Sequence, residues 1–345
     1  MPARLKKTSQ VNCRWQNDSS KAKQCTNKRK KLPKFDSEKI KFQDEYSDPS
    51  YDDDSSSDEF ENMTQIDIKQ YTKPMYCPQY AEKIIINAQK EEAETRIQIS
   101  NFHKIQTEIT MNMRSIVIRW LINVHHDFAM SSETLFNAIY FFDYTLSQVN
   151  IPKSEIQLLG TVCLMMAAKI DELKPPNISE IIELCSTHYK ISEFEVYERL
   201  VFRTLNYRLH YPHTKTFLKR YLNALEANSS FSDIANFICE ASLFCYDLNI
   251  YNPSAVAVAI IVITSCCLKS VLPLKKLHLY SHISNFQEIE EIIILLVFSA
   301  KEVLESRKGA IYQRYTDPRS SGSLLNLKFD DDLMKHIQRL HISTK

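Results

Sequence analysis

Two segments of this sequence are apolar around the whole circumference of a helix, and they limit the possible folds more than any other feature. The first runs from Ile156 to Ala168 and the second from Pro253 to Leu268. A helix of this kind must be surrounded by other helices, because none of its faces is suited to water. Gly160 and Ala167 add small side chains where neighbouring helices can approach closely. We therefore predict two helical units, each built around a buried central helix.

Glycine is too scarce for several classes of enzyme. The chain of 345 residues contains only three glycines, Gly160, Gly309 and Gly322, whereas an average chain contains about 7%. Phosphate-binding loops need several closely spaced glycines, so their absence argues against a nucleotide-binding enzyme. No nucleophile–base pair or carboxylate pair stands out either. We expect a non-catalytic protein that needs no cofactor.

The cysteines and the apolar segments indicate which cellular compartment the chain is suited to. The nine cysteines include no CxxC pair, and most lie in apolar helical segments. They are typical of buried thiols in a reducing compartment, and we expect no metal site. The longest apolar run, from Ala255 to Leu268, is too short to span a bilayer. We expect no contact with a membrane, and the opening residues lack the apolar segment of a secretory signal.

The first 72 residues differ from the remainder in how their charged side chains are distributed. Lys and Arg dominate residues 1–34, and Asp and Glu dominate residues 35–61. Neither block has helical or strand periodicity, which predicts a disordered regulatory tail over residues 1–72. A basic cluster in this tail is typical of a nuclear-import signal. It consists of Lys28, Arg29, Lys30 and Lys31.

Helical periodicity continues from Tyr76 onward, so the predicted fold class is all-α. The predicted domains are residues 76–209, 210–310 and a C-terminal extension over 311–345. In the first, a helix over 78–107 precedes a five-helix unit over 112–127, 132–149, 152–170, 178–186 and 193–207. In the second, helices over 214–226 and 230–247 precede the apolar helix from Pro253, and two more lie within 284–305. Ser192 and Glu195 have the spacing of a capping box at the fifth helix, and Asn177 is a suitable cap for the fourth.

The first unit resembles the cyclin box, in which five helices surround a buried one. Residues 113–117, MRSIV, stand at the position of the cyclin motif MRAIL, and Trp120 follows at the expected spacing. Gln157, Gly160 and Lys169 match the central helix of the family. Residues 171–176, DELKPP, take the place of EEIYPP, and Glu198 matches a second signature acid.

The second unit resembles B-type cyclins more weakly. Residues 217–220, FLKR, are similar to the FLRR element of that subclass. Tyr246-Asp247 and Arg314-Tyr315 match two further short elements. The resemblance extends from about Tyr76 to Leu327 and identifies the chain as similar to mitotic A- and B-type cyclins.

This resemblance implies a regulatory subunit that binds and activates a cyclin-dependent protein kinase, and a role in cell-cycle progression at G2/M. Cyclins pack on the mobile C-helix of the kinase and favour the arrangement that has the catalytic ion pair. Lys169 and Glu198 would form the polar centre of the kinase interface, together with Asp171 and Glu172. An internal salt bridge between Lys169 and Glu198 is the alternative interpretation.

The resemblance also implies a groove that binds RxL peptides of substrates or inhibitors. Its lining would be Met113, Ile116, Val117, Trp120 and Gln157. Ordinary core packing is the alternative for some of these side chains. Two residues of the same helix depart from the family, because Asn123 replaces an acid and Arg119 replaces the usual Asp. Weaker or altered binding of cationic motifs is therefore expected, and Arg114 and Gly160 are predicted to be structural.

In the tail, Arg29 and Leu32 fit the RxxL core of a destruction box, which would bring a ubiquitin ligase as partner. The expected location is the nucleus and the cytoplasm. Two alternatives share the fold: a transcription-type cyclin, and a TFIIB-like transcription factor. The second would require a zinc ribbon and a basic folded core, and the sequence has neither, so we expect no direct binding of nucleic acid.

Overall fold

The computed structural model describes residues 80–270, 277, 281, 286–307 and 309–316, and every regular element in these ranges is helical. The prediction of an all-α fold is confirmed. The predicted tail, with its basic cluster and RxxL sequence, lies outside the described residues, as does most of the predicted C-terminal extension. Among the helices that are described, none combines the length and the apolar character needed to cross a membrane.

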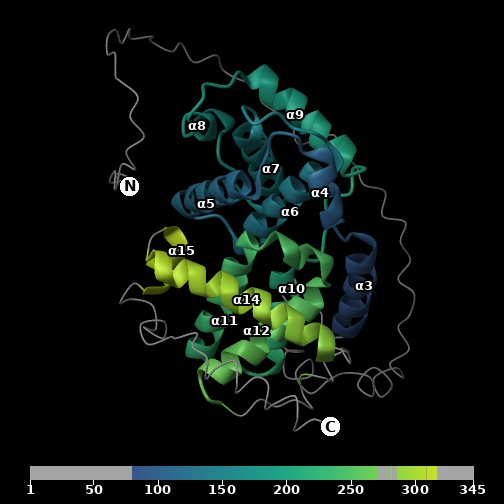
Figure 1. Ribbon diagram of the computed structural model, residues 1–345, viewed down its shortest axis with the longest axis vertical. Helices are drawn as coiled ribbons and strands as arrows, with labels where there is room; N and C mark the ends of the chain where they lie inside the picture. The colour runs from purple at the N-terminus through teal and green to yellow at the C-terminus, as the bar shows by residue number, and fades with distance from the viewer. Residues whose placement is uncertain (1–79, 271–276, 278–280, 282–285, 308, 317–345) are drawn as a thin grey trace, which may run out of the picture. The chain divides into compact units, whose positions relative to one another are not determined.

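The first group of helices surrounds a buried central helix, as predicted (Figure 1). The central helix is α7, which packs against α5, α6, α8 and α9. All its residues from Ile156 to Ala168 are buried except Gln157. The bounds are Met111–Asp127 for α5, Ser132–Gln148 for α6, Ile156–Asp171 for α7, Ile178–Ile182 for α8 and Ile191–Thr204 for α9.

The second group surrounds α12 in the same way, with α10, α11 and α14 packed against it (Figure 1). Its bounds are Thr214–Ala224 for α10, Ser229–Ala241 for α11, Pro253–Cys267 for α12, Phe286–Ser306 for α14 and Ala310–Thr316 for α15. Two short 3₁₀ helices, η2 (Ser242–Phe244) and η3 (Tyr246–Ile250), connect α11 to α12.

The prediction of two helices within residues 284–305 was wrong, because the single helix α14 occupies this region. Its buried apolar residues recur at helical spacing without a Gly or Pro to interrupt them. They are Ile289, Ile292, Ile293, Leu296, Ala300 and Val303.

The prediction of one helix over residues 78–107 was also wrong. The chain forms α3 (Ala81–Glu94) and α4 (Ile99–Ile105), separated by a short extended segment. The Thr95 carbonyl accepts a hydrogen bond from the Tyr140 hydroxyl at 3.0 Å. This carbonyl is therefore used by α6 at the point where a continuous helix would need it for its own backbone.

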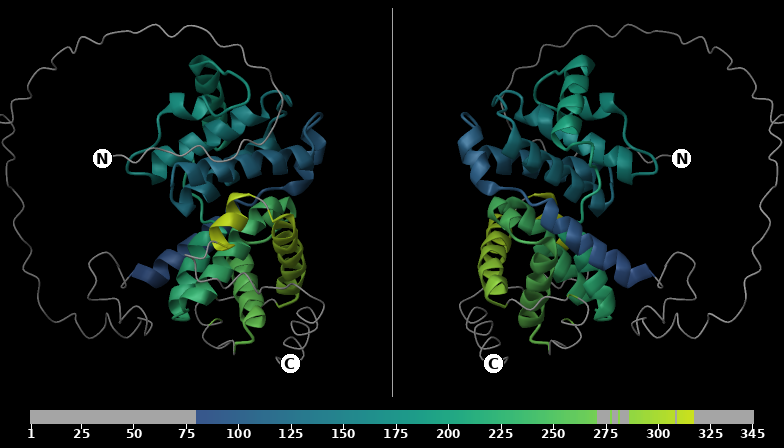
Figure 2. Two further views of the ribbon diagram at one scale, coloured as in Figure 1. Left: turned by 90° about the vertical axis from the view of Figure 1, so that its left-hand side faces the viewer. Right: turned by 90° about the vertical axis from the view of Figure 1, so that its right-hand side faces the viewer.

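Helix α3 is hydrogen-bonded to the second group of helices at the beginning of α12 (Figure 2). The Glu92 carboxylate accepts hydrogen bonds from the Ser254 amide at 2.8 Å and the Ser254 hydroxyl at 2.5 Å. Arg96 donates two more, at 2.8 and 2.6 Å, to the side-chain oxygen of Asn252. A carboxylate is favoured at a helix N-terminus, where backbone N–H groups lack partners. Burial nevertheless raises the pKa of Glu92, although the Ser254 hydrogen bonds oppose this rise.

The beginnings of α8 and α9 test the two predicted caps. Asn177 caps α8, because its side chain accepts a hydrogen bond from the Ser179 amide at 3.2 Å. The cap at Ser192 was misplaced by two residues, because α9 begins at Ile191 with Lys190 as its N-cap residue. Glu193 accepts from the Lys190 amide at 2.6 Å, which is the acidic half of a capping box. A lysine ammonium group cannot accept a hydrogen bond and supply the other half.

Gly160 lies at a close contact between α5 and α7, which supports a structural role. A Cβ atom there would lie 2.9 Å from Cγ1 of Val117 and 3.4 Å from Cδ1 of Leu121. We expect Gly160→Leu to lower the free energy of unfolding by about 1–3 kcal/mol through overpacking. Gly160→Ala should cost less, because the gain in helix propensity, about 1 kcal/mol, offsets the crowding.

Urea denaturation of both variants measures these effects. A leucine placed at the exposed position Ser192 of α9 is the matched control. Wild-type stability of Gly160→Leu would contradict a tight contact between α5 and α7.

Candidate functional site

The end of α7 and the middle of α9 bring Lys169 and Glu198 together on the surface. The Lys169 ammonium group donates to the Glu198 carboxylate. The side chains are 48% and 23% exposed, respectively. An exposed ion pair contributes only about 0–1 kcal/mol to stability. The two charges therefore remain accessible to a binding partner, while they also form the salt bridge considered as the alternative.

The apolar pattern of α7 explains the position of Lys169. The helix is buried up to Ala168, and Lys169 extends from its last turn, where the negative end of the helix dipole favours a cation. The next residue, Ile170, is 45% exposed. An accessible charged pair is thus flanked on α7 by an exposed aliphatic side chain.

Tyr207 was not predicted as a site residue, although it is 69% exposed. It follows α9 in a turn where Asn206 and Tyr207 both have positive φ, at 50° and 60°. Asn tolerates this conformation, but it is unusual for a bulky residue such as Tyr. Its ring lies 6.2 Å from that of Phe202, measured between centroids. Asn206 is the one weak signal for this turn in the amino-acid sequence.

Asp171 and Glu172 are half-buried, and their carboxylates are directed to α6 and its N-cap residue. Asp171 accepts a hydrogen bond from the Asn137 amide at 2.8 Å. Glu172 accepts from the Ser131 amide and the Thr134 hydroxyl, both at 2.6 Å. Burial alone would raise the pKa of Glu172, but these hydrogen bonds lower it below the ordinary value. Both acids thus have partners in the first two turns of α6 or at its N-cap residue, and their role in a kinase interface remains a prediction.

The five predicted groove residues lie on α5 and α7, which pack against each other. Ile116 is 59% exposed and Val117 only 6%, so Val117 belongs mainly to the core. Met113 and Trp120 are half-buried against the core. The Gln157 side-chain oxygen accepts from the Ser186 amide and hydroxyl, at 3.2 and 2.6 Å. An apolar surface with a positioned amide is present, but Val117 contributes little of it.

Asn123 and Arg119, the two departures from the family pattern, contact the second group of helices. The Asn123 side-chain oxygen accepts from the Ala310 amide, at the beginning of α15, at 3.3 Å. The Arg119 guanidinium lies over the Phe244 ring, 5.3 Å from its centroid. Both polar side chains are therefore directed to contacts between the two groups.

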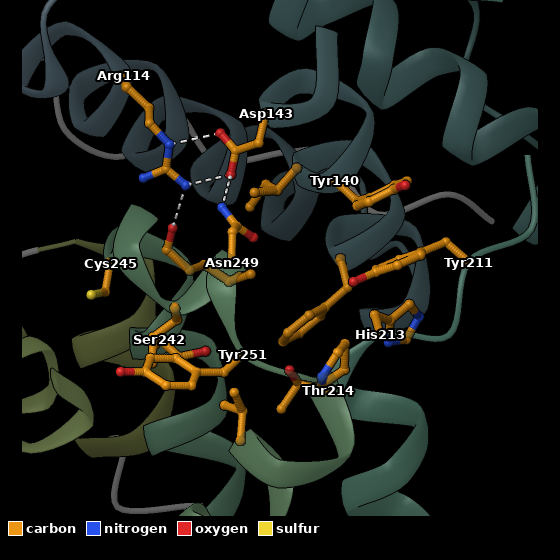
Figure 3. Close-up of a pocket in the computed structure, with 16 residues that line it drawn as sticks. Arg114, Tyr140, Asp143, Tyr211, His213, Thr214, Ser242, Cys245, Asn249 and Tyr251 are labelled. Atoms are coloured by element: carbon orange, nitrogen blue, oxygen red, sulfur yellow. Dashed lines mark hydrogen bonds and ion pairs between the residues drawn. The ribbon is translucent and has the colours of Figure 1, made fainter. Parts of the chain in front are cut away.

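Arg114 is a buried link between the two groups, which supports its predicted structural role (Figure 3). Its guanidinium donates to both Asp143 oxygens at 2.7 and 2.6 Å. It also donates to the carbonyls of Leu243 and Phe244 at 3.1 and 3.0 Å. Arg114 and Asp143 are each only 2% exposed. The guanidinium further lies over the Tyr246 ring, 5.0 Å from its centroid.

A cavity of about 70 Å³ lies beside this link, lined by residues of α6, of the beginning of α10 and of the segment that leads to α12 (Figure 3). The volume is small, and the cavity has room for a few water molecules. His213 lines it and caps α10, because its Nδ1 accepts from the Thr216 amide at 3.3 Å. Burial lowers the pKa of His213 to about 4.

Comparison with known proteins agrees with this arrangement. Residues 83–210 match the family model "Cyclin, N-terminal domain", and residues 212–326 match "Cyclin, C-terminal domain". The chain is 29% identical over 245 residues to a G2/mitotic-specific cyclin-A of Hydra viridissima, covering 70% of this chain and 58% of that protein. It is 30% identical over 215 residues to G2/mitotic-specific cyclin S13-7 of Glycine max, covering 62% and 83%.

A solved structure shares the fold. The viral cyclin from herpesvirus saimiri superposes with a TM-score of 0.57 at 18% identity, covering 65% of this chain and all of that one. The chain spans about half the length of several curated relatives, among them two plant cyclins of B type, of which it covers 51% and 52%.

Proposed function

The chain belongs to the cyclin family, and from this premise we propose that it is a non-catalytic subunit that binds and activates a cyclin-dependent protein kinase. Its similarity to A- and B-type mitotic cyclins supports a role in progression through G2/M. The observation that carries the proposal is the accessible Lys169–Glu198 pair at the end of the buried helix α7. Ile170 and Tyr207 add exposed apolar surface on α7 and after α9.

The proposed interface can act on a kinase without any chemistry of its own. Exposed apolar side chains provide area that a partner removes from water, and charged groups specify its orientation. Kinase catalysis requires an ion pair between a strand lysine and the C-helix glutamate. A subunit that binds only the arrangement with this ion pair raises the population of the active kinase.

Charge reversal tests the interface against the alternative of an internal salt bridge. We expect Glu198→Lys and Lys169→Glu each to weaken kinase binding at least 10-fold, which is about 1.4 kcal/mol. The double reversal restores an internal salt bridge but presents reversed charges to the kinase. Binding should therefore remain weak in the double variant, as measured by calorimetry with a purified cyclin-dependent kinase.

Lys219→Glu is the matched control, because Lys219 forms a comparable exposed pair with Glu133 at 3.4 Å on other helices. All variants should keep the helical circular dichroism spectrum. Recovery of binding by the double reversal would show that the pair matters only to the fold. Normal binding by both single variants would remove these residues from the interface.

We further propose that the apolar surface of α5 and α7 binds RxL-type peptides of substrates or inhibitors. We expect Trp120→Ala to weaken binding of such a peptide at least 10-fold in fluorescence polarisation, because the half-buried indole is the largest side chain of the proposed groove. Asn123→Glu should strengthen it several-fold by adding a carboxylate for the peptide's arginine. No detectable binding by the wild type would refute the groove.

The N-terminal tail supports two further proposals, which rest on sequence alone. The basic cluster from Lys28 to Lys31 favours import into the nucleus, with residence in the cytoplasm before import. The RxxL sequence formed by Arg29 and Leu32 would place the chain under the control of a ubiquitin ligase.

A further inference from the structure

Helix α14 presents an exposed stripe that the proposed kinase and peptide sites do not use. The stripe consists of Glu291, Ile294, Phe298 and Lys301. These residues are spaced by three, four and three positions, so they share one face of the helix. Ile294 and Phe298 are 52% and 70% exposed and form the apolar centre of the stripe. Exposed Glu291 and Lys301 stand at its two ends.

The sequence after α15 contains a segment with the same spacing and the same order of charge, with an acid at its N-terminal end and a base at its C-terminal end. Asp330, Leu333, Ile337 and Leu340 recur at intervals of three, four and three residues, and His341 follows. In a helix these residues would form one face, with the acid at its N-terminal end. Lys335 and Arg339 would lie on the opposite face.

We propose that residues 330–341 bind as a helix on the exposed stripe of α14, antiparallel to it. In this register Asp330 meets Lys301, Leu333 meets Phe298, and Ile337 meets Ile294. Charge complementarity selects the antiparallel direction, because the parallel one would bring Asp330 to Glu291. His341 then lies beside the Glu291 carboxylate, which also accepts from the Tyr251 hydroxyl at 2.9 Å.

The connection between the two elements is long enough for this contact. Helix α15 ends at Thr316 and packs against α14. Residues 317–329 span up to about 43 Å when extended, at about 3.3 Å per residue. A tethered segment also reaches a high effective concentration at its site, so a small apolar contact is sufficient. This favours the chain's own segment over a second copy as the occupant.

Hydrogen–deuterium exchange of the full chain tests the proposal. We expect the amides of residues 333–341 to exchange at least 10-fold more slowly than the rates of an unstructured peptide, at all protein concentrations. Phe298→Ser should abolish this protection. Lys301→Glu should reduce it several-fold, and the double variant Lys301→Glu with Asp330→Lys should restore it.

Lys219→Glu on α10 is the control for a charge change elsewhere, and it should leave the protection unchanged. Protection that survives Phe298→Ser would place the segment on another surface and overturn the proposal. Protection that increases with protein concentration would show a second copy as the occupant. No protection in the purified chain would also overturn it, and would leave the stripe to a different protein.

Discussion

Replacing Arg114 with alanine is expected to lower the free energy of unfolding by about 3–5 kcal/mol. The substitution leaves the Asp143 carboxylate, which is 2% exposed, without its cationic partner. Asn249 remains as a donor to Asp143 at 3.3 Å, but a neutral amide cannot balance a buried charge. The carbonyls of Leu243 and Phe244 lose a donor in the same step.

Urea denaturation of a small set of variants measures this effect and separates charge from shape. Arg114→Lys should recover little stability, because an ammonium group cannot make the paired hydrogen bonds to a carboxylate. Arg114→Met combined with Asp143→Leu should cost less than the sum of the two single changes, since it removes both charges together.

The exposed Arg203 of α9 provides the matched control, and Arg203→Ala should change stability by no more than about 0.5 kcal/mol. A loss of less than about 1 kcal/mol for Arg114→Ala would show that the link contributes little, because broken buried pairs cost several times that amount.

The central helices were predictable because the signal is local and repeated. A segment that is apolar on every face can be recognised from its own residues, and both α7 and α12 occur where this pattern lies. Pro253, at the first turn of α12, and Asn177, the cap of α8, act within their own helices. Such features do not depend on residues far away in the sequence.

The end of α11 shows why other features could not be predicted. The apolar pattern continues past Ala241 and suggested a helix up to residue 247, but α11 ends at Ala241 and two 3₁₀ helices follow. The carbonyls of Leu243 and Phe244 accept from Arg114, which precedes them by 129 and 130 residues. A contact at this separation leaves no trace in the local pattern.

Some features of the candidate site were likewise predictable from the sequence, and others depend on residues far away in the chain. Lys169 and Glu198 were expected to meet, because each stands at a family position on a predicted helix, and they form an ion pair. The direction of Glu172 was not predictable, because its partners Ser131 and Thr134 lie 41 and 38 residues earlier in the chain. The exposure of Tyr207 depends on a strained turn that propensity does not foresee.

Acidification is expected to destabilise the protein through His213. Burial lowers the pKa of this histidine to about 4 from its ordinary value of 6.5; nearby Glu133 opposes the shift, and Lys215 and His210 add to it. The folded chain therefore binds fewer protons than the unfolded chain between these two pH values. The lowered pKa of His213 therefore contributes about 3 kcal/mol to the free energy of unfolding above about pH 6.5. This contribution is lost as the pH falls to about 4.

The hydrogen bonds of His213 also indicate that its protonation destabilises the folded chain. Nδ1 of His213 accepts the Thr216 amide at the first turn of α10, so the neutral ring must carry its proton on Nε2. Protonation adds a hydrogen to Nδ1 and removes the cap. The ring also lies beside that of Phe136, with 5.3 Å between centroids, in a position with little access to water.

Urea denaturation of the wild type and His213→Asn between pH 7.5 and pH 4.5 isolates this group. Asparagine keeps a neutral N-cap acceptor but does not titrate, so other groups such as Glu92 contribute equally to both proteins. When the pH is lowered from 7.5 to 5, we expect the free energy of unfolding of the wild type to fall by about 2 kcal/mol more than that of the variant. Parallel pH profiles would show that His213 keeps an ordinary pKa in the folded chain, and hence that water reaches the contact between the two helical groups.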